Sequence, residues 1–305
     1  MYNTGENNAF LWGWPVLNAI ITELFRTPHE LAARGNCRID VDATGKAHVW
    51  CAERIEVKHS TSYTYRISYT TNGELRDFTL NNIHLSHPLV SFFPDGRSVV
   101  VSQRHYRATI ENNAWIVDER GVILSSFRTH DAVSSVQVTR GGNIWISYFD
   151  ETDAGQLDCY DQFGRNIFDY YSFSEQHNLA PIGDCYAMNA SDDEEVWICY
   201  YPEFPLVHIS HFTQSESWAI DAMAGTRAFA VDGQSVLFAG NHIAADTLTL
   251  GDLHSGDLEN VQTITSAGEV IHLPSPTYIG RGDIMYVSSS DRLYRIDIHS
   301  LKSGL

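Results

Sequence analysis

The sequence predicts an all-β fold in which one small antiparallel sheet is repeated around a ring. Three observations support this prediction. Residues 141–171 hold three short apolar runs separated by turns, a turn followed by a bulky apolar run occurs six times, and the last copy lacks its outer strand. Repeats of roughly 40–50 residues with four short strands each are typical of β-propeller blades. We therefore predict a six-bladed β-propeller of four-stranded antiparallel blades.

The clearest blade spans residues 133–171. Val133–Val138 alternates between apolar and polar residues, and three runs rich in β-branched and aromatic residues follow it. These runs are Ile144–Phe149, Leu157–Tyr160 and Ile167–Tyr171. Glycine-containing turns bound them, which is the pattern of an antiparallel meander.

A turn followed by an apolar run with a bulky centre marks the second strand of each blade. Its copies lie at 44–53, 95–103, 141–149, 193–201, 232–240 and 281–289. The alternating runs that precede them, expected as inner strands, are Cys37–Val41, Leu89–Phe93, Val133–Val138, Cys185–Ala190, Arg227–Val231 and Val270–Leu273. Trp50, Trp145 and Trp197 recur at one position of this pattern, so we expect them in the core between sheets.

The sixth copy ends after Leu293–Ile298 without an outer strand, whereas the apolar residues of Phe10–Phe25 have no blade. We expect part of residues 1–33 to supply the missing strand, because closing the ring removes an exposed sheet edge. A helix over Asn18–Leu31 is the alternative, since several apolar residues there have helical spacing. No linker-like segment interrupts the repeat, so we expect a single domain over residues 1–305, with 1–33 as its closing segment.

Charge and cysteine content restrict the partners and the compartment. The chain has 38 acidic and 20 basic residues, a net charge of −18, which disfavours nucleic acid and anionic membranes and suits a basic protein partner. Five cysteines without a CxxC pair indicate a reducing, cytoplasmic location rather than a disulfide framework or a zinc site. Because no basic residue precedes Phe10–Phe25, we expect neither export nor membrane insertion.

Two short motifs connect the third copy to known repeats. Gly142-Asn143-Ile144-Trp145-Ile146 and Leu157-Asp158-Cys159-Tyr160-Asp161 resemble the blades of two-component-regulator-type and NHL-type propellers. The resemblance is full in the third copy and partial in most others, so it covers nearly the whole chain. It implies the propeller fold and leaves the activity open, because propellers host many functions.

In such a fold, the loops after second strands and before first strands open on one face around a central channel. The residues expected there after second strands are Arg104, Asp150, Glu151, Tyr200, Tyr201, Glu203, Phe204, Asn241 and His242. Those expected before first strands are His130, Asp131, Asp184 and Arg227. Together they predict a partner-binding face of mixed acidic, aromatic and imidazole character.

Three of these acids come from neighbouring blades. Asp150, Glu151 and Asp184 could bind a hard cation such as Ca²⁺ or Mg²⁺ through carboxylate oxygens, or act in acid–base chemistry. The alternatives are a solvated acidic rim, contact with a basic partner, or an Asp184 side chain that binds loop amides. The favoured interpretation is a solvated rim, or an Asp184 that binds loop amides at the blade junction, so we expect no cofactor.

Catalytic motifs are missing from the sequence, which has no GxSxG, GxGxxG or P-loop pattern. Cys185 is the one thiol near the predicted face, with His130 or His242 as conceivable neighbours. It starts an inner strand, however, so we expect it to pack in the core. The sequence thus favours a non-enzymatic role over catalysis.

The function that we favour is binding of a protein partner through the acidic and aromatic loop face. Tyr200, Tyr201 and Phe204 crowd one loop beside Pro202 and Pro205, and aromatic side chains in a rigid loop are typical of interface anchors. An immunity-type inhibitor of a basic toxin is one such protein. The alternative is a metal-dependent hydrolase or lactonase that resembles some six-bladed propeller enzymes and holds a cation in the channel. Asp150, Glu151, Asp184 and Asn241 are candidate equivalents of the ligands by predicted location alone.

Overall fold

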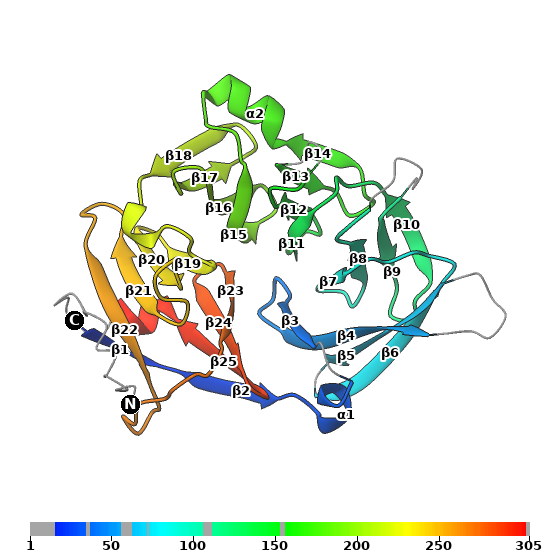
Figure 1. Cartoon of the computed structure of the whole chain (residues 1–305), viewed down its shortest axis with the longest axis horizontal. Coiled ribbons are helices and arrows are strands. Elements are labelled where there is room, and N and C mark those ends of the chain that lie inside the picture. Colours follow the sequence, from blue (N-terminus) through cyan, green and yellow to red (C-terminus); the bar gives the residue numbers. More distant parts are fainter. Residues whose placement is uncertain are drawn as a thin grey trace, which may run out of the picture.

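The computed structural model describes residues 16–34, 37–55, 63–71, 73–105, 112–152 and 156–302. Six sheets stand in a ring, all antiparallel except for one parallel strand at the edge of one sheet, which confirms the predicted six-bladed propeller (Figure 1). Within these ranges, no helix has the length and apolar character needed to span a membrane.

Each of the first three blades is a four-stranded meander whose strands follow the chain from the channel outward. Blade one comprises β3 (Arg38–Val41), β4 (Ala47–Ile55), β5 (Thr64–Thr71) and β6 (Glu74–Asn81). Blade two comprises β7 (Pro88–Phe92), β8 (Ser98–Ser102), β9 (Ala114–Val117) and β10 (Ile123–Phe127). Blade three comprises β11 (Val133–Val138), β12 (Ile144–Tyr148), β13 (Leu157–Tyr160) and β14 (Asn166–Asp169).

The other three blades keep the same order of strands. Blade four comprises β15 (Asp184–Asp192), β16 (Glu195–Tyr201), β17 (Leu206–Ser210) and β18 (Gln214–Trp218). Blade five comprises β19 (Ala228–Asp232), β20 (Ser235–Ala239), β21 (Leu248–Asp252) and β22 (Leu258–Ile264). Blade six comprises β23 (Thr277–Arg281), β24 (Ile284–Ser289) and β25 (Arg292–Asp297). The inner strands of neighbouring blades contact one another around the ring, and β23 meets β3 where the ring closes.

The N-terminal segment closes the ring, as predicted, and does so with two strands. β2 (Thr22–Arg26) pairs antiparallel with β25 and completes blade six, and β1 (Val16–Ile20) pairs parallel with β22 as a fifth strand of blade five. The alternative of a long helix is wrong, because α1 covers only His29–Ala32. Burial explains the outcome: Ala19 and Ile21 are buried while Ile20 is 50% exposed, a period of two rather than 3.6.

Two local expectations were wrong. The inner strand of blade six is β23 rather than Val270–Leu273, because Val270 bridges back to Ile264 beside the outer strand β22. The expected strand Ile167–Tyr171 ends early and runs into α2 (Tyr170–His177). Asp169 caps this helix, since its carboxylate accepts hydrogen bonds from the amide of Tyr171 at 3.0 Å and the hydroxyl of Ser172 at 2.8 Å.

The core lies between facing sheets, and the recurring tryptophans lie in it as predicted. Trp145 is fully buried and packs against Phe168, with ring centroids 5.3 Å apart. Trp197 stacks on His208 with centroids 4.1 Å apart and planes 8° from parallel. These rings therefore bury large apolar areas that hold neighbouring blades together.

The chain reverses between strands on two opposite faces of the ring. The face with the loops before inner strands and after second strands is called the loop face, and the other is called the turn face. On the turn face, Asp161 accepts hydrogen bonds from the amides of Phe163 at 2.9 Å and Arg165 at 3.0 Å. Gly164 closes this turn with a φ of 86°, a value that favours glycine. Asp42 shapes the turn between β3 and β4 of blade one in the same way, since its carboxylate accepts hydrogen bonds from the amides of Thr44 and Lys46.

A buried arginine closes the turn-face end of the channel. Arg281 donates hydrogen bonds to the carbonyl oxygens of Val41 at 2.8 Å and Val138 at 2.5 Å, and so joins blades one, three and six. Burial lowers its pKa, and the nearby carboxylates of Asp40 and Asp42 oppose that shift. The channel is therefore open toward the loop face and plugged by polar groups at the other end.

Candidate functional site

The predicted partner-binding residues lie on the loop face of blades two to five. They come from the loops after β8, β12, β16 and β20 and from the segments that enter β11, β15 and β19. The strand register places Asp184 directly opposite Tyr201, and the amide of Gly183 donates to the carbonyl oxygen of Tyr201 at 2.8 Å. The acidic and aromatic parts of the predicted face therefore meet at one edge of blade four.

Arg104 gathers several predicted residues of blades two and three into an ion-pair cluster. Its guanidinium pairs with Asp131 at 3.4 Å and with Glu151, and it lies over the Phe149 ring at 5.3 Å from the centroid. The amide of His105 also donates to Asp131, at 2.7 Å. Arg104 compensates part of the charge of the two carboxylates, so the cluster fastens blade two to blade three and holds Glu151 in an ion pair.

His130 covers a buried polar group of blade three. Its ring stands edge-on to Tyr148, with centroids 5.6 Å apart. Behind it, the hydroxyls of Tyr148 and Tyr160 both donate to the Asp158 carboxylate, at 2.7 and 3.2 Å. Burial raises the pKa of Asp158, although the two tyrosines and His130 favour its charged form. His130 thus belongs to the support of the face as well as to its surface.

Four rings form a compact cluster where blades four and five meet. The aromatic cluster consists of Tyr186, Tyr201, Phe204 and His242. Phe204 is edge-on to Tyr186 and to His242, with centroids 5.0 Å apart in both pairs, and lies 5.9 Å from Tyr201. Tyr201 is 54% exposed, so the cluster offers an aromatic surface to a partner.

The backbone that carries the aromatic cluster is held in an uncommon conformation. Glu203 and Phe204 have φ values of 67° and 48°, in the left-handed region. Non-glycine residues there cost about 1–3 kcal/mol each and persist where the surroundings enforce them. Here the contacts of the Phe204 ring with Tyr186 and His242 hold the backbone in this conformation.

The neighbouring loop of blade five is braced from within. The side chain of Asn241 accepts hydrogen bonds from the amides of Ile243 and Ala244, both at 2.8 Å. The amide of His242 donates to the carbonyl oxygen of Ala224 at 3.0 Å. Asn241 therefore shapes the loop, whereas His242 and the 95% exposed Ile243 present their side chains at its surface.

Carboxylates without a cationic partner lie beside the aromatic cluster. Within the described part of the chain, Asp150, Asp184 and Glu203 form no ion pair. Burial raises the pKa of Asp184, and the negative charge of Asp150 raises it further. Burial and these same two carboxylates also raise the pKa of Tyr186. Negative charge is thus concentrated here without compensation, which disfavours the charged form of Asp184.

The three acids predicted to lie together, Asp150, Glu151 and Asp184, take part in two separate sets of interactions. Glu151 pairs with Arg104, while Asp150 and Asp184 influence each other. In the described ranges, no three side chains of the types His, Cys, Asp and Glu are arranged to hold a metal ion. Binding of Ca²⁺ or Mg²⁺ at these carboxylates stays a prediction.

Two side chains near the face are buried. Tyr200 was expected to contact a partner, but it is 1% exposed and its hydroxyl lies 3.0 Å from that of Tyr170. The reason is the strand alternation of β16, which turns Tyr200 inward and Tyr201 outward. Cys185 packs in the core as expected, and burial raises its pKa to about 12. It is therefore a poor nucleophile at neutral pH.

The mouth of the channel contains residues that the sequence did not single out. A cavity of about 270 Å³ opens there, bordered by the inner strands of all six blades. Its polar lining includes Arg38, Ser134, Tyr186, Tyr278 and the predicted residue Arg227. Tyr186 belongs both to this cavity and to the aromatic cluster, so the two adjoin. Side chains two residues apart on a strand point to the same face, so Tyr186 could have been expected beside Asp184 on β15.

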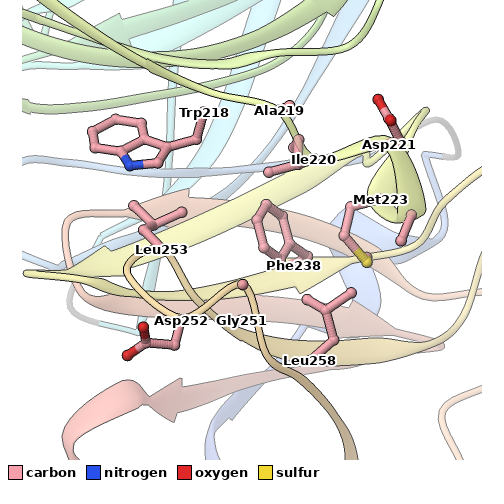
Figure 2. A pocket seen from close by; sticks show the side chains of 12 residues that line it. Trp218, Ala219, Ile220, Asp221, Met223, Phe238, Gly251, Asp252, Leu253 and Leu258 are labelled. Atoms are coloured by element: carbon pink, nitrogen blue, oxygen red, sulfur yellow. The ribbon is translucent and has the colours of Figure 1, made fainter.

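A separate apolar groove of about 210 Å³ lies between blades four and five (Figure 2). Trp218, Phe238 and Leu253 face one another across it, and Met223 closes one end. None of the predicted binding residues lines this groove. It adjoins the short helix Asp221–Met223, whose following residue Ala224 supports His242.

The chain is similar to one protein family and to several solved structures. Residues 157–296 match the YxzG family. No curated protein matches the chain. A streptogramin B lyase structure is 9% identical, covers 91% of this chain and 97% of its own, and has a TM-score of 0.51. The calcium-binding protein regucalcin from Agrobacterium tumefaciens is 11% identical over 92% of this chain and 95% of its own, with a TM-score of 0.49. At 9% identity, the likeness to the lyase structure concerns the fold alone and indicates no particular activity.

Proposed function

We propose that this protein is a non-enzymatic propeller that binds a basic protein partner through the loop face of blades four and five. The observation that carries the proposal is the aromatic cluster flanked by Asp150, Asp184 and Glu203, which form no ion pair in the described part of the chain. An acidic inhibitor that neutralises a basic toxin in the cytoplasm is one protein of this kind.

The aromatic cluster suits the centre of an interface. Tyrosine and phenylalanine bury large areas at a small loss of side-chain freedom, and they are enriched among the residues that dominate binding energy. Phe204 is held by Tyr186 on one side and His242 on the other, so the loop is already ordered before a partner arrives. Such preorganisation lowers the entropic cost of association.

The carboxylates define the chemistry of the partner. A guanidinium or ammonium group placed on Tyr201 would gain a cation–π contact and the attraction of Asp184, which lies opposite Tyr201 in the sheet. Its positive charge would also offset the repulsion that raises the pKa of Asp184. The net charge of −18 would in addition steer a basic protein toward the propeller.

The test is affinity capture from a native lysate with three immobilised baits, followed by binding kinetics on each retained protein. The baits are the wild type, a variant carrying Asp150→Asn, Asp184→Asn and Tyr201→Ala, and a turn-face control carrying Asp95→Asn. We expect a basic protein that the wild type and the control retain and the triple variant loses. The purified wild type is also incubated with a panel of lactones and esters, with and without Ca²⁺ and Mg²⁺.

Two results would contradict the proposal. One is a retained protein that the triple variant binds as tightly as the wild type, since the binding surface would then lie elsewhere. The other is turnover of a lactone or ester with no specific capture, since the propeller would then be a hydrolase.

A further inference from the structure

The channel mouth combines two arginines with a cavity, on a chain that is strongly acidic overall. Arg38 and Arg227 both border the cavity of about 270 Å³. Arg38, Ser134 and Tyr278 also border an adjoining hollow of about 590 Å³ between blades six and one. Since the cavities share these side chains, the mouth continues as one concave surface from the channel to that blade junction.

Both arginines lack a carboxylate partner among the residues that the structure describes. In the portion of the chain that the structure describes, Arg38 and Arg227 form no ion pair and no side-chain hydrogen bond. Many of the described arginines do pair with a carboxylate, as Arg104 does with Asp131. Burial lowers the pKa of Arg38, and no anion offsets that effect. Two solvent-accessible guanidinium groups therefore border one cavity without a carboxylate to pair with in the described ranges.

We propose that the mouth of the channel binds a small anion with a carboxylate or phosphoryl group, held by Arg38 and Arg227. The planar guanidinium presents paired N–H donors that match the oxygens of both groups. This site goes beyond the binding of a protein partner and does not depend on it.

Other lining groups can complete the site. The hydroxyl of Tyr278 has no hydrogen-bond partner in the described ranges. Burial and the charge of Asp246 raise the pKa of Tyr278 to about 12, so it remains a donor at neutral pH. Ser135 and Tyr186 border the same cavity and carry further hydroxyls. These hydroxyls would add hydrogen-bond donors to the two guanidinium groups around the ligand.

The described carboxylates near the cavity do not form ion pairs with Arg38 or Arg227. Asp40 borders it, but its side chain accepts hydrogen bonds from the hydroxyl of Ser91 at 3.1 Å and the amide of Phe92 at 2.9 Å. Its electrostatic partners are Arg281 and His48, on the turn-face side. Asp246 and Asp184 act on the tyrosines of the mouth, and neither forms an ion pair with Arg38 or Arg227.

The size of the cavity limits the ligand. Pockets for drug-sized molecules start at about 300 Å³, so about 270 Å³ suits a small metabolite. We would use two probes, inorganic phosphate and the dicarboxylate succinate, with sodium chloride at matched ionic strength. Titration calorimetry and thermal unfolding are measured on the full-length protein with no partner present.

The variants are Arg38→Gln, Arg227→Gln and Arg38→Lys, with Arg140→Gln as the matched control. Arg140 is an exposed arginine in the turn between β11 and β12, on the turn face, so it undergoes the same change of charge far from the cavity. We expect saturable binding of at least one probe, a dissociation constant raised about tenfold or more by either glutamine, and no change in the control. Arg38→Lys keeps the positive charge but removes the paired N–H donors of the guanidinium, so it should give an intermediate dissociation constant.

The choice between probes identifies the ligand group, since binding of phosphate alone indicates a phosphoryl ligand and binding of succinate alone a carboxylate. The proposal is overturned when neither probe binds saturably at millimolar concentration. It is equally overturned when all variants are stabilised alike, because that is the general effect of excluded anions. Circular dichroism of each variant verifies the fold, and the exposed position of both arginines predicts that it is retained.

Discussion

The Phe204 ring stands edge-on to the imidazole of His242, with centroids 5.0 Å apart and planes at 84°. Phe204 follows the second strand of blade four and His242 follows the second strand of blade five. This contact therefore joins two loops that are separate in sequence into one surface. The predictions that concern binding depend on this surface, and those that concern stability depend on the buried polar groups and strands that support it.

The aromatic cluster should control how long a partner stays bound. Tyr201→Ala and Phe204→Ala should raise the dissociation rate of a captured partner tenfold or more, since buried aromatic anchors contribute about 2 kcal/mol or more. Tyr171→Ala is the matched control, because Tyr171 is 56% exposed and Tyr201 54%. Surface plasmon resonance measures these rates. Equal dissociation rates for the Tyr201 and Tyr171 variants would exclude Tyr201 as an anchor.

The acids beside the cluster should govern association while slightly destabilising the free protein. Burial and Asp150 raise the pKa of Asp184 above its unfolded value, so ionisation of Asp184 costs stability as pH rises through that range. Asp184→Asn should therefore leave the melting temperature unchanged or higher at neutral pH. It should lower the association rate with a basic partner, and the difference should fade at high salt. A fall of several degrees in melting temperature would show that Asp184 is structural.

Asp42 provides a test of stability against pH. Burial would raise its pKa, but hydrogen bonds from His48, Thr44 and two amides lower the pKa to about 2. A lowered pKa stabilises the fold above the unfolded value near 3.8–3.9, and this contribution disappears as pH falls toward 2. Asp42→Asn should thus lose about 2 kcal/mol at neutral pH and much less near pH 2.

Urea unfolding at the two pH values measures this effect. Asp95→Asn is the control, since Asp95 accepts the amide of Arg97 at 3.1 Å in a comparable turn, but its side chain is 54% exposed. A loss from Asp42→Asn that is equal at both pH values would mean that the charge of Asp42 is not what stabilises the turn.

The repeat made most of the fold predictable. Strands and turns depend on neighbouring residues, so the apolar runs around Trp50, Trp145 and Trp197 were enough to mark the second strands of three blades. The exact alignment was wrong for blade one, where the register places His48, two residues before Trp50, at the position of Trp145. The segment after Asp169 was harder, because its aromatic residues suit a strand as well as they suit α2. The aromatic loop was also foreseeable, and strict attention to alternation would have excluded Tyr200.

Contacts across the channel could not be predicted from the sequence. Arg281 donates to the carbonyl oxygen of Val41, a residue 240 positions away, and no local pattern relates the two. Arg38 was likewise not distinguished from other arginines, since only the closed ring brings it to the same cavity as Arg227. The pairing of Glu151 with Arg104 also depends on how two blades meet.

The two N-terminal strands should be needed for the stability of the whole ring. Deleting residues 1–30 removes β1 and β2, which uncovers the edges of β22 and β25 and leaves apolar groups around Leu301 and Tyr294 without cover from Ala19 and Ile21. Exposed edges pair with other chains, so we expect a lower melting temperature and self-association. Calorimetry and light scattering measure both quantities. Deletion of residues 1–15, which keeps β1 and β2, is the comparison that isolates the two strands. A protein that lacks residues 1–30 yet stays monomeric and melts at the wild-type temperature would show that closure by these strands is dispensable.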